Sequence, residues 1–254
     1  MRDTLVLAYH AISPTWPAAL SVEPERLDAQ LEVLAAMGYR AATFTEAVTR
    51  PPASRTLAVT FDDGLRSVID LALPILERHD MVGTVFIPTT YVGRDGAARW
   101  PGIDRWIGGP HEAELTPMSW SDVGRLQEAG WEIGSHTRSH PSLRGLAADA
   151  LHEELAASRR ECEERLGGRC TAVAYPYGDV DRRVMDAARS CGYLAAAALP
   201  ERIHRTHRFR WPRVGIWHND PERVFAAKLS PLRRRRLDFR TGAVCMLPRW
   251  RWDG

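Results

Sequence analysis

At 254 residues, the chain is long enough for one large α/β domain or two small ones, and its 44% of hydrophobic residues supports a sizeable core. A formal net charge of +2 is too small to indicate nucleic acid as a partner. The sequence has no apolar stretch of about 18 residues, so we expect no membrane span.

Strand and helix patterns alternate along the chain. Short apolar or β-branched runs predict strands, and apolar residues spaced three and four apart predict helices. The expected strands cover residues 5–8, 39–43, 57–61, 84–87, 132–135, 171–174, 193–198 and 213–217. The expected helical segments cover residues 24–37, 45–48, 66–79, 120–129, 149–166, 180–191 and 222–229. Such alternation implies a mostly parallel sheet in one domain, either doubly wound or closed into a barrel.

Particular residues mark some of these boundaries or predict an irregularity within a helix. Ser119 is a suitable N-cap for the helix that follows it, and Pro74 predicts a kink inside 66–79. Residues 88–117 show no regular pattern, and a loop of that length in a compact domain is usually functional or mobile.

The first residues are too soon interrupted by polar side chains for a signal peptide, so we expect a cytoplasmic protein. The cysteines lie at irregular spacings without a C-x-x-C pair, which indicates neither a zinc knuckle nor a redox pair. We expect buried thiols in a reducing compartment rather than a disulfide framework. The four cysteines are Cys162, Cys170, Cys191 and Cys245.

Polar residues of the kinds that act in catalysis or metal binding follow several of the expected strands. They are His10, the pair Asp62 and Asp63, His136, and the segment 175–177. In parallel α/β proteins the reactive groups gather where the strands end, so we expect these residues to lie at one edge of the sheet.

The adjacent carboxylates of Asp62 and Asp63 would raise one another's pKa unless a cation or a proton resolves the conflict. An isolated pair of this kind can equally lie in solvent. Here a second cluster follows at 134–140, which contains His136 and His140. Neutral imidazoles and a carboxylate are the ligands of a catalytic zinc site that keeps one position open for water. The two clusters together favour an enzyme.

Three motifs resemble those of the polysaccharide deacetylases, the carbohydrate esterases that share the NodB homology domain. They are Thr-Phe-Asp-Asp-Gly at 60–64, His-Thr-Arg-Ser-His at 136–140 and Tyr-Pro-Tyr-Gly at 175–178. The resemblance implies a single distorted (β/α)7 barrel, which we place at 1–230. It also implies one bound divalent metal, most often zinc, and the removal of acetyl groups from sugars.

Carried over residue by residue, the resemblance makes Asp63, His136 and His140 the metal ligands and Asp62 the general base. The i, i+4 spacing of the two histidines puts both on one face if 137–139 form a helical turn. The backbone N–H of Tyr177 resembles the donor that holds the tetrahedral oxyanion.

The chain departs from the family pattern in two places. Val173 stands where many members have an arginine that orients the base, and Arg213 is our candidate replacement. The late motif that supplies the general acid is matched only loosely, ending at His218. However, Tyr9-His10 resembles the early Tyr-His of the subgroup acting on poly-N-acetylglucosamine, so we favour His10 as the acid.

The expected partner is a carbohydrate, in the first place an N-acetylglucosamine-containing glycan. Loop tryptophans at positions 16, 100 and 106 can supply an aromatic platform for sugar. Two alternatives remain: a small N-acylated molecule such as a lipid-linked or nucleotide-linked amino sugar, and a non-catalytic carbohydrate-binding relative. The basic segment 231–254 is either a solvated tail or a weak contact for anionic membrane surfaces.

Overall fold

The computed structural model describes residues 3–199 and 206–230. The predicted basic tail at 231–254 and Cys245 therefore lie outside the described residues. Among the residues that are described, no helix is both long and apolar enough to cross a bilayer.

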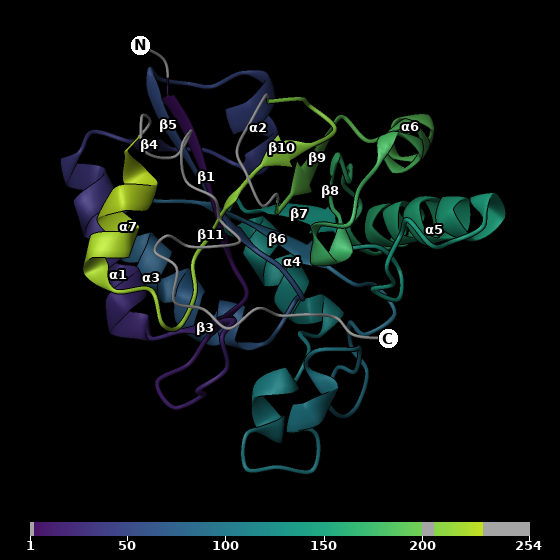
Figure 1. The fold of residues 1–254 in the computed structure, drawn as a ribbon, viewed down its shortest axis with the longest axis horizontal. Helices are drawn as coiled ribbons and strands as arrows, with labels where there is room; N and C mark the ends of the chain where they lie inside the picture. Colours follow the sequence, from purple (N-terminus) through teal and green to yellow (C-terminus); the bar gives the residue numbers. More distant parts are fainter. Residues whose placement is uncertain (1–2, 200–205, 231–254) are drawn as a thin grey trace.

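The strands form one parallel sheet at the centre of the molecule (Figure 1). In space they follow the order β10-β9-β8-β7-β6-β5-β1-β11, with β4 paired to β5 beside this path. Their bounds are β1 Asp3–Tyr9, β4 Arg40–Ala41, β5 Arg55–Phe61, β6 Gly83–Ile87, β7 Glu132–Ser135, β8 Ala172–Ala174, β9 Ala195–Ala198, β10 Trp211–Pro212 and β11 Val214–Gly215.

One short segment joins the two edges of this sheet. The backbone N–H of Arg213 donates to the carbonyl of Ala198 on β9 (3.0 Å), and that of Ile216 donates to Ala8 on β1 (2.9 Å). Because the same segment pairs with both edge strands, the sheet closes into the predicted barrel instead of the open doubly wound form. The single strand predicted at 213–217 is wrong in detail, since the chain changes neighbour at Arg213 and forms β10 and β11.

The helices cover the outside of the sheet. In Figure 1, α1, α3 and α7 lie on one side of the barrel and α5 and α6 on the other. Their bounds are α1 Pro24–Ala36, α2 Phe44–Thr49, α3 Leu73–Arg78, α4 Trp120–Glu128, α5 Ala148–Leu166, α6 Arg182–Ser190 and α7 Glu222–Leu229. Two short strands, β2 (Ala11–Ile12) and β3 (Ser21–Val22), form a separate small sheet that the sequence did not predict.

Two local predictions can be compared with the helices directly. Ser119 does cap α4, accepting from the backbone N–H of Asp122 at 3.1 Å in a capping box. The helix predicted at 66–79 is irregular in its first half, where η1 (Val68–Ala72) is a π-helical turn that leads into α3. Pro74 has no N–H to continue the α-helical ladder, which agrees with a change of helix type just before it.

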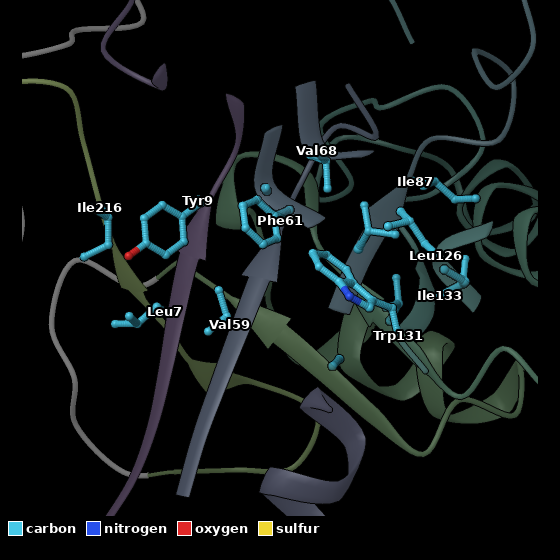
Figure 2. Packing of buried hydrophobic residues seen from close by; sticks show 14 of the residues in the cluster. Leu7, Tyr9, Val59, Phe61, Val68, Ile87, Leu126, Trp131, Ile133 and Ile216 are labelled. Carbon is cyan, nitrogen blue, oxygen red and sulfur yellow. The ribbon is translucent and has the colours of Figure 1, made fainter. Parts of the chain in front are cut away.

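The two faces of the strands pack differently. Between the sheet and the helices, Tyr9 stacks on Phe61 and Phe61 on Trp131, each with ring centroids 5.5 Å apart (Figure 2). The opposite face carries mostly small side chains: Val6, Ala58, Ala172, Ala174, Ala195 and Ala197 cluster there with Phe86. Alternate strand residues point to opposite faces, so the residues that follow Tyr9 and Phe61 are directed to the small-residue side.

The long segment between β6 and α4 has its own small core. Its two short 3-10 turns are η2 (Asp104–Trp106) and η3 (Glu112–Leu115). It forms the blue-green lobe at the bottom of Figure 1. A separate apolar cluster holds it against the barrel; the cluster contains Ala11, Trp16, Ala18, Leu65, Ala98, Trp100, Ile103 and Leu115. Trp16 is fully buried in it, so the sequence-based suggestion of a sugar platform at Trp16 is wrong.

Candidate metal centre

The predicted site residues meet at the carboxyl end of the barrel strands. Asp62 and Asp63 follow β5, His136 follows β7, and Tyr177 follows β8 after two intervening residues. Since β5, β6, β7 and β8 pair in parallel, these ends share one edge of the sheet. His140 reaches the same place from the loop after β7.

Asp63, His136 and His140 face one another closely enough to share an ion. Asp63 Oδ1 lies 3.5 Å from His136 Nε2 and 3.4 Å from His140 Nε2. One ligand atom from each residue lies within 4.8 Å of the other two, and all three side chains are buried. One carboxylate and two imidazoles suit zinc with a position left open, so the residues present fit a divalent ion.

His136 is prepared as a metal ligand by its surroundings. Its Nδ1 lies 2.9 Å from the carbonyl oxygen of Ala174, which selects the tautomer with a proton on Nδ1 and a lone pair on Nε2. Burial lowers the pKa of His136 to about 4, so the ring is neutral near pH 7. Burial raises the pKa of Asp63, but the hydrogen bond with His140 and the nearby imidazoles bring it below its usual value.

His140 arrives by a different route from the one predicted. The helical turn at 137–139 that would put both histidines on one face does not form, because Thr137 and His140 have φ of 66° and 62°, in the left-handed region. The hydroxyl of Thr137 accepts from the backbone N–H of His140 at 3.1 Å and closes the turn. The imidazole of His140 therefore reaches Asp63 from a tight turn and not from a helix.

Strained backbone is concentrated at this edge of the barrel. In the described part of the chain, four of the five non-glycine residues with positive φ are Asp63, Thr137, His140 and Tyr177. A left-handed conformation costs a non-glycine residue roughly 1–2 kcal/mol, and such residues cluster at functional sites. The backbone here is therefore shaped to aim side chains and peptide groups at one point.

Asp62 lies beside the three clustered groups, with its Oδ2 4.0 Å from His136 Nε2, and is held there by Arg213. The guanidinium donates to both carboxylate oxygens of Asp62, at 2.7 Å each, and to the hydroxyl of Thr60 at 3.0 Å. Arg213 is fully buried, with its guanidinium carbon 5.4 Å from the ring centroid of Phe86. Burial raises the pKa of Asp62, but Arg213 and then His136 outweigh it, so the carboxylate stays ionised.

His10 and His218, the two candidates for the acid, occupy different surroundings. His10 Nε2 lies 3.9 Å from Asp62 Oδ2, and its ring stacks on Trp217 with centroids 5.5 Å apart. His218 donates its backbone N–H to Ala19 at 2.9 Å. Within the described residues its ring makes no ion pair or ring contact with Asp62 or His136, unlike the ring of His10.

Tyr177 borders the same group of side chains. Its ring packs edge-on against His140, with centroids 4.8 Å apart, and its hydroxyl donates to the carbonyl of Pro101 at 3.3 Å. Burial raises the pKa of its hydroxyl, so the phenol is not the acid or base of a reaction near pH 7.

The structure adds neighbours that the sequence did not reveal. Trp100, suggested as a sugar platform, stacks instead on His140 with centroids 4.3 Å apart. Trp217 precedes the loosely matching His218 but itself contacts His10. Trp106 is partly exposed and packs on Trp16, with centroids 5.7 Å apart. A tryptophan in an irregular segment carries no periodicity from which such a contact could be deduced.

Comparisons with known proteins give the chain a family model and named relatives. A family model described as polysaccharide deacetylase matches residues 49–196. The chain is 26% identical over 217 residues to YxkH of Bacillus subtilis, named provisionally as a polysaccharide deacetylase, covering 81% of this chain and 70% of that protein. It is 24% identical over 169 residues to the peptidoglycan-N-acetylglucosamine deacetylase PgdA of Listeria monocytogenes, covering 65% of this chain but only 31% of PgdA.

Solved structures share the fold. The Streptococcus pyogenes deacetylase PplD superposes with a TM-score of 0.73 at 22% identity, covering 89% of this chain and 98% of that chain. IcaB from Ammonifex degensii gives a TM-score of 0.71 at 23% identity, covering 87% of this chain and 95% of that chain. At these identities the likeness establishes the barrel architecture.

Proposed function

The chain belongs to the polysaccharide deacetylase family, and from this premise we propose that it hydrolyses the acetamide of an N-acetylated amino sugar in a glycan. The products are acetate and a free amine, and N-acetylglucosamine is the sugar we favour. The name of the Listeria relative supports this choice of sugar. Asp63, His136 and His140 are the proposed ligands of one divalent ion, and zinc is the ion we favour. When bound, such an ion polarises the amide carbonyl and makes water a stronger acid.

Asp62 is the proposed general base. Each of its oxygens accepts a hydrogen bond from Arg213 and keeps a further lone pair that can take a proton from the attacking water. Arg213 is then a positioning residue: it holds the carboxylate ionised and in one orientation beside the ion site. The carboxylate of Asp62, paired with Arg213 beside three side chains that could hold an ion, is the observation that carries the proposal. A purely structural ion site has no need of it.

His10 and Tyr177 complete the proposed chemistry. His10 donates a proton to the amine nitrogen as the carbon–nitrogen bond breaks, which its position beside Asp62 supports. The backbone N–H of Tyr177 donates to the oxygen that becomes negative when water adds to the carbonyl. Positive φ at Tyr177 sets the direction of the peptide groups on either side.

Acetate release from N-acetylglucosamine oligomers of several defined lengths tests the function. We expect release of acetate and of free amine in equal amounts, faster from longer oligomers than from the monosaccharide. Release from a small N-acylated amino sugar only would replace the glycan by a small substrate. Binding of oligomers without any release, in protein shown to hold its ion, would contradict the enzymatic proposal.

The assignment of the acid is tested by a matched pair of variants. Removing a general acid costs about 100- to 10,000-fold in turnover, so His10→Ala should lose most activity while keeping its ion. His218→Ala should run close to the wild-type rate, because the ion pair with Asp62 is made by His10. The reverse outcome would assign the role to His218.

A further inference from the structure

The two imidazoles of the metal centre are held by different means. A metal-bound histidine usually donates its second ring N–H to a carbonyl or carboxylate, which fixes the orientation of the ring. His136 does so through Ala174. The Nδ1 of His140 is buried and has no hydrogen-bond partner among the described residues. The Nε2 of His140 faces Asp63, so packing around the ring has to supply the orientation that a partner at Nδ1 gives His136.

Aromatic rings enclose His140 on two sides. Trp100 lies over its face, with centroids 4.3 Å apart and planes 25° from parallel, and Tyr177 meets it at 74° with centroids 4.8 Å apart. The hydroxyl of Tyr177 donates to the carbonyl of Pro101, the residue after Trp100. Trp100 and Tyr177 therefore both contact His140, and Tyr177 is also hydrogen-bonded to the segment that carries Trp100.

Trp100 is itself firmly placed. It is only 5% exposed and belongs to the apolar cluster that holds the lobe between β6 and α4. Tyr91 also packs edge-on against it, with centroids 5.0 Å apart. A ring fixed in this way restricts the rotation of the imidazole stacked on it.

We propose that Trp100 is a positioning residue for the metal centre: its indole sets the orientation of His140 in place of the hydrogen bond that His136 makes. Ion affinity then depends on the lobe that carries Trp100. By thermodynamic reciprocity, a bound ion stabilises that lobe to the same degree. The inference builds on the proposed ligand set Asp63, His136 and His140.

Two variants separate stacking from simple space filling. Trp100→Phe keeps an aromatic face, whereas Trp100→Leu fills much of the space without one. Trp106→Leu is the matched control, because Trp106 lies in the same lobe and packs on Trp16 and His111, not on a proposed ligand. Circular dichroism and thermal unfolding of the ion-free proteins select variants that are folded.

The measurement is the Zn²⁺ dissociation constant, obtained by competition with a chromophoric chelator. Loss of a partner that orients a ligand typically weakens ion binding about 10- to 100-fold, and we expect a loss of this size for Trp100→Leu. Trp100→Phe should recover most of it, and Trp106→Leu should match the wild type. Equal affinities for the Leu and Phe variants would overturn the role of Trp100, whereas a wild-type protein that binds no Zn²⁺ would overturn the ligand set itself.

Proteolysis supplies the reciprocal test in the same proteins. Arg94 and Arg99 are exposed trypsin sites within the lobe. Zn²⁺ should slow cleavage at these sites in the wild type and in Trp106→Leu, and should do so less in Trp100→Leu. Equal protection in wild type and Trp100→Leu would show that the lobe and the ion are not coupled.

Discussion

The two ends of the barrel each hold a carboxylate that is withdrawn from solvent, fully at Asp62 and partly at Glu132, and they stabilise it in opposite ways. At the carboxyl end, Asp62 pairs with the guanidinium of Arg213 and its pKa is lowered. At the amino end, Glu132 is the first residue of β7, and burial raises its pKa. The neutral partners of Glu132 come from α2, from β6 and from the residue before β8: the backbone N–H of Thr45 donates at 2.8 Å, the hydroxyl of Thr84 at 3.4 Å and that of Thr171 at 3.1 Å.

The different partners indicate what each end of the barrel contributes to the protein. Hydroxyl partners can satisfy a carboxyl group in either protonation state, so Glu132 serves to tie strands to α2 without requiring a fixed charge. Arg213 requires Asp62 to be ionised and leaves it beside a candidate ion site. In barrels of this type the carboxyl end carries chemistry and the amino end stability. Variants at the two ends test this division between chemistry and stability.

The largest effect is expected on turnover. Asp62→Asn removes the proposed proton acceptor and should lower the rate of acetate release about 100- to 10,000-fold. Glu132→Gln should leave the rate close to that of the wild type. The measurement compares the initial rates of acetate release from oligomers in the two variants, after circular dichroism has shown that both are folded. A similar loss in both variants would contradict the division between the ends.

The next effect is on stability. Arg213→Met leaves Asp62 buried without its cation, and removal of one partner from a buried ion pair costs about 3–5 kcal/mol. Denaturant unfolding measures the change. The control is Arg66→Met, because the Arg66–Asp70 pair is more than half exposed on both sides and such pairs contribute about 0–1 kcal/mol. Equal losses in the two variants would show that the buried pair contributes no more to the free energy of unfolding than the exposed pair does.

The smallest effect is a change in pH dependence. The pKa of Glu132 is raised in the folded protein, so its stabilising contribution is complete below its unfolded pKa of about 4.3 and is lost as pH rises through the folded value. In Glu132→Gln the amide can still accept from Thr45 N–H and donate to the threonine hydroxyls, but it does not titrate. Unfolding free energies at several pH values from about 4 to 7 should therefore fall less in the variant than in the wild type. Parallel curves would contradict the raised pKa.

The sequence predicts the strand-borne part of the site better than the rest. Asp62 and His136 directly follow strands that the sequence predicts at 57–61 and 132–135, so parallel pairing alone places them at one edge. The family resemblance added the division of roles between Asp62 and Asp63, which remains a proposal. The closure of the barrel at Arg213 was harder to foresee, because two strands of two residues leave almost no periodic signal.

Contacts made by irregular backbone were not predictable. The spacing of His136 and His140 suggested a helical turn, whereas the chain uses positive φ at Thr137 and His140. The hydrogen-bond partners of Glu132 lie 39 to 87 residues away along the chain. Trp100 reaches His140 only because a separate apolar cluster folds the lobe onto the barrel. Such contacts depend on tertiary packing, which local patterns do not encode.

Ion content in the two neighbouring aspartate variants is the most direct test of the proposed centre. Asp62 and Asp63 are adjacent in sequence, yet only Asp63 faces both His136 and His140 within 3.5 Å. Elemental analysis after dialysis should find about one divalent ion per chain in wild type and Asp62→Asn, and almost none in Asp63→Asn. Retention of the ion by Asp63→Asn, or its loss from Asp62→Asn alone, would contradict the division of labour between the two carboxylates.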